Sequence, residues 1–256
     1  DYSVKLTALE ALAETKPQAA GSAAAGLLGS VADYESMRGL LAAVMPRPAA
    51  VTAMTAALQK QSCAPDAAKL ALRVLTATGQ SAPELSALLY GVLGAGGGVP
   101  AYDPAWVAEL AAEVQAKGDP GRGRAVFAST LTNCVARHKV GGEGGIIGPE
   151  LDAVGRGGAV ELMIEAIVWP NRQIKEGYVA TTLTLKDGRT LQGYKIAEGR
   201  GELQLKDLLS GEVHRFSNAQ IASKLEAGSL MPEGLTMAMT RAELADLVAY
   251  LMTLGR

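Results

Sequence analysis

The spacing of apolar residues changes along the chain, and this change limits the folds available to it. Through residues 1 to about 100, apolar residues recur at helical spacing, as in Leu85-Leu88-Leu89-Val92, which predicts one amphipathic helix after another. From Tyr178 to Phe216, apolar and polar residues alternate instead, which predicts strands. We therefore expect a mainly α protein with a small antiparallel β insertion of about four strands at about 178–216.

Prolines divide the first region into separate helices. Pro17, Pro48, Pro65 and Pro83 each stand where one apolar pattern gives way to the next, and proline is favoured in the first turn of a helix. Short helices with short connections are typical of an α-solenoid of the HEAT kind, and a plain helical bundle is the alternative. Aromatic residues make up only 4% of the chain, and Ala and Leu dominate it, which suits closely packed helices.

A glycine-rich run at residues 94–100 has the composition of a flexible linker. We therefore predict a HEAT-like helical domain at 1–100 and a second domain at 101–256. Within the second domain, Asp119 and Pro120 are predicted to be the N-cap and the first residue of a helix. Helical spacing returns at Thr240 and predicts a final helix.

The charge balance excludes several classes of partner. The chain has 24 Lys and Arg against 26 Asp and Glu, a formal net charge of -2, which gives no reason to expect nucleic acid or an anionic membrane.

No apolar run approaches the roughly 18 residues of a membrane helix, so we expect no transmembrane segment. The chain begins at Asp1 without a signal-peptide pattern, which we interpret as a processed end or a cut made for expression.

Hydrolytic chemistry has no support in the motifs. The sequence contains neither G-x-S-x-G nor H-E-x-x-H, and its two histidines leave little room for a triad or a zinc site. A glycine-rich run at 141–145 lacks the Gly-Lys-Ser/Thr of a phosphate-binding loop. We expect no hydrolase and no nucleotide site of that kind.

The informative segment begins at Cys134 and ends at His138. Haem attachment in c-type cytochromes uses C-x-x-C-H, in which two thiols bond the haem vinyl groups and the histidine binds iron. Here Cys134 and His138 stand at the first and last positions of that pattern, and Arg137 stands where the second cysteine should be. An ordinary loop histidine is the alternative interpretation of His138.

The order of motifs around this segment resembles the cytochrome c fold. Gly123 to Phe127 precede Cys134, Gly148-Pro149-Glu150-Leu151 follow His138, and Ser-Leu-Met-Pro-Glu-Gly-Leu at 229–235 stands before the final helix. This order, over about residues 119–254 and including the inserted strands, is similar to the haem-binding domain family first described from planctomycete and verrucomicrobial bacteria. A helical repeat region often precedes that domain.

The resemblance implies a role for each matching residue. Cys134 would hold one haem c through a single thioether, and His138 and Met231 would be the two iron ligands. The Pro149 carbonyl would fix the ring of His138, and Leu151 would pack on the haem face. A thioether sulfur favours ferrous iron, so His/Met ligation raises the reduction potential relative to two imidazoles.

Alternatives remain for some of these roles. Met237, Met239 and His214 are the other residues that could serve as the second iron ligand. Gly123 is expected to let the final helix approach closely, with Phe127 and Tyr250 at the crossing. Cys63 is interpreted as a small, partly buried residue between helices, and Trp169 as a core residue at a helix end.

The resemblance implies an electron-transfer c-type cytochrome domain that is not itself an enzyme. It would accept electrons from a redox partner protein, a sugar or alcohol dehydrogenase that is a subunit or a domain of the same larger protein. Covalent haem attachment takes place outside the cytoplasm, so we expect a periplasmic or otherwise exported location. The alternative, which Arg137 suggests, is a haem-free protein-interaction module built on a helical solenoid and a degenerate cytochrome fold.

Overall fold

The computed structural model describes residues 2–61, 63–94, 100–208 and 210–255. The chain divides into two compact units, Asp1–Gly97 with Met237–Arg241 and Gly98–Thr236 with Ala242–Arg256. Most of the predicted glycine-rich linker, residues 95–99, lies outside the described residues. None of the described helices is both long and apolar enough to cross a bilayer.

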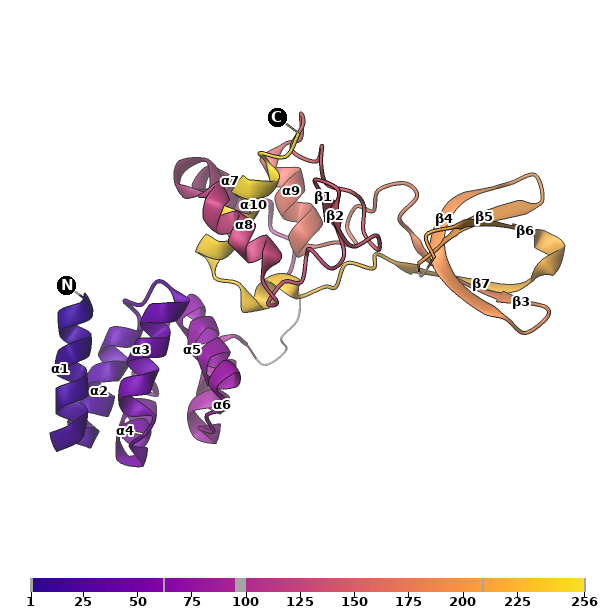
Figure 1. Ribbon diagram of the computed structural model, residues 1–256. Coiled ribbons are helices and arrows are strands. Elements are labelled where there is room, and N and C mark those ends of the chain that lie inside the picture. Colours follow the sequence, from indigo (N-terminus) through magenta and orange to yellow (C-terminus); the bar gives the residue numbers. More distant parts are fainter. Residues whose placement is uncertain (1, 62, 95–99, 209, 256) are drawn as a thin grey trace. The chain divides into compact units, whose positions relative to one another are not determined.

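The N-terminal unit consists of short helices arranged in two rows (Figure 1). The odd-numbered helices contact one another in chain order, as do the even-numbered ones, and each odd helix also packs on the even helix that follows it. Their bounds are α1 (Tyr2–Thr15), α2 (Pro17–Leu28), α3 (Tyr34–Val44), α4 (Pro48–Leu58), α5 (Pro65–Thr78) and α6 (Pro83–Val92).

Proline begins most of these helices, as the sequence predicts. Pro17, Pro48, Pro65 and Pro83 are the first residues of α2, α4, α5 and α6. A first-turn residue needs no backbone N–H for the helix, and the fixed φ of proline already matches the helical value. These four predicted helix starts are confirmed.

The core of the N-terminal unit is built from Leu, Ala and Met. Met37, Leu40 and Leu41 of α3 are fully buried, and α2 buries a stripe of small residues against α4. Gly21 lies within that stripe, where an added Cβ would come within 2.0 Å of the Ala50 carbonyl oxygen. The small residues therefore allow two helix backbones to approach closely, as the composition suggests.

In its described residues, the C-terminal unit combines four α-helices with a small sheet (Figure 1). The helices are α7 (Pro104–Lys117), α8 (Pro120–Ala128), α9 (Val160–Val168) and α10 (Arg241–Leu251), of which Arg241 clusters with the N-terminal unit. Two short strands, β1 (Lys139–Val140) and β2 (Glu143–Gly144), form a hairpin after His138. Two 3₁₀ turns cover Asn218–Gln220 and Leu235–Ala238.

The crossing of α8 and α10 has the geometry that the sequence predicts. A Cβ on Gly123 would lie 1.9 Å from the backbone oxygen of Asp246, so glycine is required for the contact. The rings of Phe127 and Tyr250 meet there with centroids 5.6 Å apart. Asp119 is the N-cap of α8, as predicted, and its backbone N–H donates to the carboxylate of Asp246 at 2.7 Å.

The inserted sheet is larger than the sequence predicts. Its antiparallel strands follow the spatial order β6-β5-β4-β3-β7. Their bounds are β3 (Ala180–Leu185), β4 (Thr190–Gly199), β5 (Glu202–Asp207), β6 (Val213–Ser217) and β7 (Ile221–Gly228). The predicted end near Phe216 is wrong, because β7 adds a strand beside β3. Most side chains of β7 are exposed, Leu225 included, so no alternation of buried and exposed apolar residues marks this strand in the sequence.

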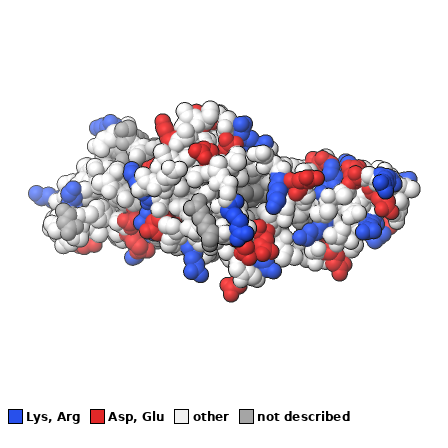
Figure 2. Space-filling view, turned by 90° about the horizontal axis from the view of Figure 1, so that it is seen from above, with Lys and Arg blue, Asp and Glu red and all other residues white. Residues whose placement is uncertain are grey.

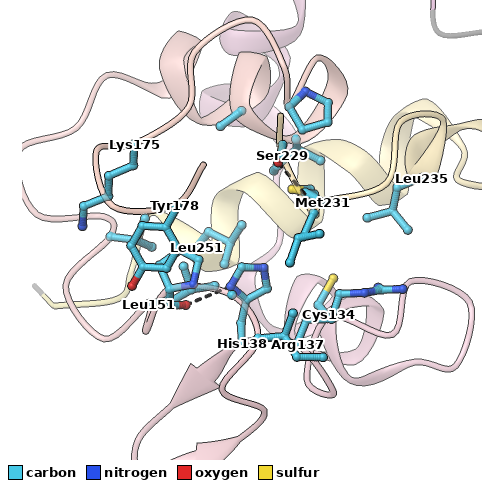
Figure 3. Close-up of a pocket in the computed structure, with 18 of the residues that line it drawn as sticks. Cys134, Arg137, His138, Leu151, Lys175, Tyr178, Ser229, Met231, Leu235 and Leu251 are labelled. Carbon is cyan, nitrogen blue, oxygen red and sulfur yellow. Dashed lines mark hydrogen bonds between the residues drawn. The ribbon is translucent and has the colours of Figure 1, made fainter. Parts of the chain in front are cut away.

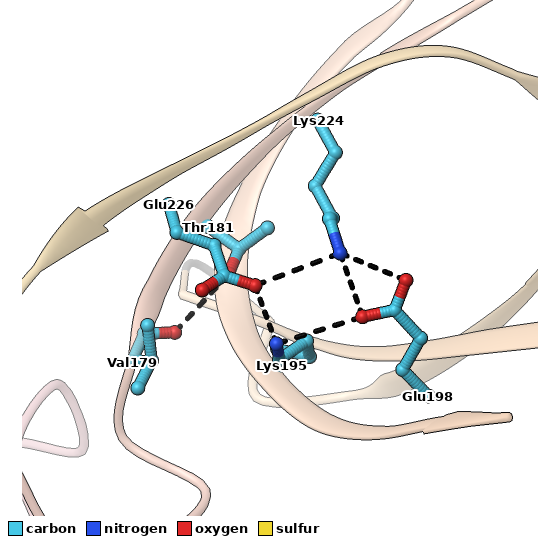
Figure 4. A network of polar contacts seen from close by, with 6 residues as sticks. All are labelled: Val179, Thr181, Lys195, Glu198, Lys224 and Glu226. Atoms are coloured by element: carbon cyan, nitrogen blue, oxygen red, sulfur yellow. Dashed lines mark hydrogen bonds and ion pairs between the residues drawn. The ribbon is translucent and has the colours of Figure 1, made fainter.

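The inserted sheet has a buried apolar cluster, and a network of paired charges lies on the same face, because Lys224 stands opposite Leu183 and Lys195 opposite Leu205. Leu183, Leu203 and Leu205 are fully buried and pack with Leu185 and Phe216. A closed network links Lys195 and Glu198 of β4 to Lys224 and Glu226 of β7, across β3 (Figure 4). On the face that Figure 2 shows, basic and acidic residues are interspersed over this part of the chain.

Candidate functional site

A cavity lies in the C-terminal unit between α8, α9, α10 and the loops that join them to the sheet. It has a volume of about 220 Å³ and is partly open to solvent, and most of its lining is apolar. Small-molecule and cofactor sites are mostly apolar hollows with a few placed polar groups, and this cavity has that character.

All five residues that the sequence singles out for cofactor binding line this one cavity. They are Cys134, His138, Pro149, Leu151 and Met231. Figure 3 shows His138 and Cys134 entering from one side of the view and Met231 from the opposite side. The structure thus brings together residues up to 97 positions apart, the separation of Cys134 and Met231 in the numbering.

The turn from Cys134 to His138 is set by its own backbone. The N–H groups of Arg137 and His138 both donate to the carbonyl oxygen of Cys134, at 3.0 and 2.9 Å. This tight turn places the sulfur and the imidazole in the same cavity. Cys134 is a buried thiol, and burial raises its pKa, so it stays protonated near neutral pH.

The ring of His138 is oriented by Pro149. Its Nδ1 lies 2.9 Å from the Pro149 carbonyl oxygen, which can only accept, so Nδ1 carries the proton and Nε2 keeps its lone pair. Burial lowers the pKa of His138, and the positive charge of Arg137 lowers it further, against the raising effect of the bond to Pro149. His138 is thus held neutral, in the form that binds a metal.

The glycine-rich loop packs against this histidine. A Cβ on Gly148 would lie 2.4 Å from Cε1 of His138, so the backbone touches the face of the ring. The N–H of Gly148 donates to the Arg137 carbonyl at 2.6 Å, and that of Gly145 donates to Val135 at 2.9 Å. The loop therefore supports the Cys-His turn, a role that its composition alone does not indicate.

Arg137 does not extend freely into the cavity. Its guanidinium donates to the carbonyl oxygens of Thr132 and Asn133, at 3.2 and 3.3 Å. Asn133 has a positive φ of 50°, so the chain turns sharply just before Cys134. Arg137 therefore links the end of this loop to its start, and it does so from the position of the second cysteine in C-x-x-C-H.

Met231 is held by the residues beside it. Its backbone N–H donates to the hydroxyl of Ser229 at 3.1 Å, and its side chain lines the cavity. The alternatives for this role lie elsewhere: His214 is in β6, and Met237 and Met239 cluster with the N-terminal unit. None of these three belongs to the described residues that line the cavity.

The inserted sheet contributes lining residues that the sequence analysis did not identify. Tyr178 lies just before β3 and Tyr194 lies in β4, and their rings meet edge to face with centroids 5.0 Å apart. Burial raises the pKa of Tyr194 to about 12. Lys175 also lines the cavity. No local signal marks these residues, because only the fold of the insertion brings them to the cavity.

The donor set fits a cofactor that brings most of its own metal ligands. Among the described residues, no cluster of three or more His, Cys, Asp or Glu side chains could hold a bare metal ion. One neutral imidazole, one thioether and an apolar wall are instead groups that would hold a haem. The buried Cys134 supplies one thiol near the imidazole, and Arg137 supplies none.

No protein-family model matches the chain, and no curated protein matches it.

Proposed function

We propose that this chain is an electron-transfer c-type cytochrome domain with one haem, preceded by a helical solenoid. The observation that carries the proposal is the convergence of Cys134, His138 and Met231 on one largely apolar cavity. The two rows of helices in the N-terminal unit support the solenoid, because stacked helical hairpins produce this pattern of contacts.

Each of these residues would have a separate role in holding the cofactor. Cys134 would form the single thioether, His138 would bind iron through Nε2, and Met231 would bind it through sulfur. Pro149 holds the imidazole in the required tautomer, and Leu151, which lines the cavity, would pack against the cofactor. The largely apolar wall limits access of water and so favours the less charged, ferrous form.

The bound haem would supply one-electron chemistry between ferric and ferrous iron. The chain's own part is to bind, orient and shield it. No proton has to move in such a reaction, so no side chain needs to act as an acid or a base. The protein is accordingly a carrier and not an enzyme.

The partner would be a dehydrogenase that oxidises a sugar or an alcohol, as a separate subunit or as another domain of the same protein. The N-terminal unit would place the haem domain beside that partner. Covalent attachment of haem implies a periplasmic or otherwise exported location. These points rest on the resemblance of the motifs around Cys134 and Met231.

The second candidate function is a haem-free interaction module, and Arg137 favours it. Because its guanidinium bonds Thr132 and Asn133, the Cys-His turn is closed without a second thioether. In this case the cavity would have lost its cofactor together with the second cysteine.

Colour and mass distinguish the two candidates. The full chain should be produced in a host with haem-attachment machinery and examined by absorption spectroscopy and by intact mass under denaturing conditions. A Soret band, split ferrous bands and a mass increased by one haem would support the cytochrome. A well-folded, colourless protein of unmodified mass would support the interaction module.

A further inference from the structure

The turn that leads from α9 into the inserted sheet is fixed from both ends. The buried Trp169 packs edge-on against Tyr102 with centroids 5.2 Å apart, and its indole N–H donates to the Pro100 carbonyl at 2.6 Å. Arg172 lies over the ring of Tyr102, 3.5 Å from its centroid, and pairs with Glu165 at 3.1 Å. Asn171, which lies with Pro170 between Trp169 and Arg172, therefore has a defined position.

Asn171 bonds the chain on both sides of Met231. Its Oδ1 accepts from the backbone N–H of Ser229 at 2.8 Å, and its Nδ2 donates to Oε1 of Glu233 at 2.6 Å. Ser229 in turn accepts, through its hydroxyl, from the backbone N–H of Met231 at 3.1 Å. One amide side chain thus links the turn after α9 to the segment that carries the methionine.

The close approach of this amide depends on a glycine. Gly228 has a φ of 86°, and a Cβ there would lie 2.6 Å from Oδ1 of Asn171. Only glycine adopts this conformation without strain and leaves room for the amide. The end of β7 is therefore shaped to receive Asn171.

We propose that Asn171 is the positioning residue for Met231, an inference that rests on the proposed His/Met haem site. Methionine is unbranched and flexible, so its sulfur loses much rotational freedom on binding iron. Holding the backbone of Ser229 and the side chain of Glu233 removes part of that cost in advance. Asn171 acts through the loop and does not line the cavity among the described residues.

The four-charge network of the sheet offers a matched control. Lys224 bonds Glu198 at 2.6 Å and ties β7 to β4 (Figure 4). Lys224→Gln removes this ion pair and so weakens the sheet. Lys224 itself makes none of the described bonds to residues 229–233. An effect that came only from loosening the sheet would appear in this variant as well.

The test measures how easily the methionine is displaced from the haem in the full-length chain. Asn171→Ala should bind added imidazole with an affinity roughly fivefold to tenfold higher, because two hydrogen bonds that favour the Met-bound state are lost. Its reduction potential should fall. Asn171→Asp keeps the acceptor for Ser229 and should lie between Asn171→Ala and the unaltered chain, while Lys224→Gln should match the unaltered chain.

A second readout does not depend on haem. In the haem-free chain, Asn171→Ala should speed amide hydrogen exchange at Ser229 and Met231 by a similar factor, and Lys224→Gln should not. Unchanged imidazole affinity in a haem-bearing Asn171→Ala chain would overturn the positioning role alone, as would an equal effect of Lys224→Gln. A full-length chain that takes up no haem would instead overturn the proposed function.

Discussion

Arg137 is the residue at which the site departs from the C-x-x-C-H pattern. Its guanidinium bonds two carbonyl groups of its own loop, so replacing Arg137 removes the two hydrogen bonds that hold this loop closed. A thiol at this position could instead form a second thioether. The change therefore tests the geometry of the turn and the presence of the cofactor together.

Arg137→Cys should shift the pyridine haemochrome band to shorter wavelength by a few nanometres, because the last vinyl group leaves conjugation. The melting temperature should rise, since a second crosslink restricts the unfolded chain much as a disulfide does. A disulfide typically stabilises the folded state by about 2–4 kcal/mol. Arg137→Ser is the control that removes the guanidinium without adding a thiol. An unmoved band together with an unmoved melting temperature would contradict a single thioether at Cys134.

Met231→Ala should remove the weak long-wavelength band of ferric His/Met haem and lower the reduction potential, because the soft sulfur ligand is lost. Absorption spectroscopy and potentiometric titration measure these effects. Met237→Ala is the matched control, since Met237 lies outside the cavity lining. A spectrum that Met231→Ala leaves unaltered would assign the ligand to Met237, Met239 or His214.

The pKa of His138 leads to a pH dependence in the haem-free chain. Burial lowers this pKa below 6.5, so the unfolded state binds the proton more readily than the folded state. The stability that the neutral His138 contributes is complete above pH 6.5 and is lost as the pH falls toward the pKa of the folded state. The free energy of unfolding, measured with denaturant, should therefore fall more over this range for the unaltered chain than for His138→Gln. Parallel curves would contradict a buried, neutral His138.

At the scale of elements, the helix starts of the N-terminal unit were predictable from single residues. Proline at the first helical position acts within one turn, so its effect does not depend on the rest of the fold. The strand β7 was not predictable, because it owes its pairing with β3 to a neighbour about 40 residues away and exposes most of its side chains. A short sequence pattern therefore predicts a helix start, but it does not predict a strand that forms through pairing with a distant segment.

The close packing of α2 on α4 gives an element-scale prediction. Gly21→Ala should destabilise the N-terminal unit by about 1–3 kcal/mol, because its Cβ would collide with the Ala50 backbone. Gly26→Ala lies on the exposed side of the same helix with nothing within 4 Å and should stabilise the unit by about 0.5–1 kcal/mol. Denaturant titration compares the two, and effects of equal sign would contradict this packing.

At the scale of the whole molecule, the division into two units predicts which residues the proposed haem site needs. Every described residue that lines the cavity belongs to the C-terminal unit. Removing residues 1–97 should therefore leave a coloured domain with unaltered electron exchange with small chemical oxidants. Haem content per chain and stopped-flow oxidation measure this, and loss of haem would show that the N-terminal unit is part of the site.

One segment complicates this division and refines the experiment. Residues 237–241 cluster with the N-terminal unit, where Met239 is buried and its carbonyl accepts from Lys69 at 2.7 Å. Truncation exposes Met239, so the shortened chain should also be made with Met239→Ser as a control for association. The two shortened chains should hold equal amounts of haem.

The sequence by itself determined the helix starts, the change from helical to alternating spacing, and the spacing of Cys134 and His138, because each depends on residues within a few positions of one another. Only the tertiary structure decided that Met231 lines the same cavity as His138, that tyrosines of the inserted sheet line it too, and that Asn171 bonds both sides of Met231. Met231 is 93 positions from His138, and the two bonds of Asn171 span 58 and 62 positions. Such contacts form only when buried apolar surface offsets the entropy of closing long loops, and no local pattern encodes that balance.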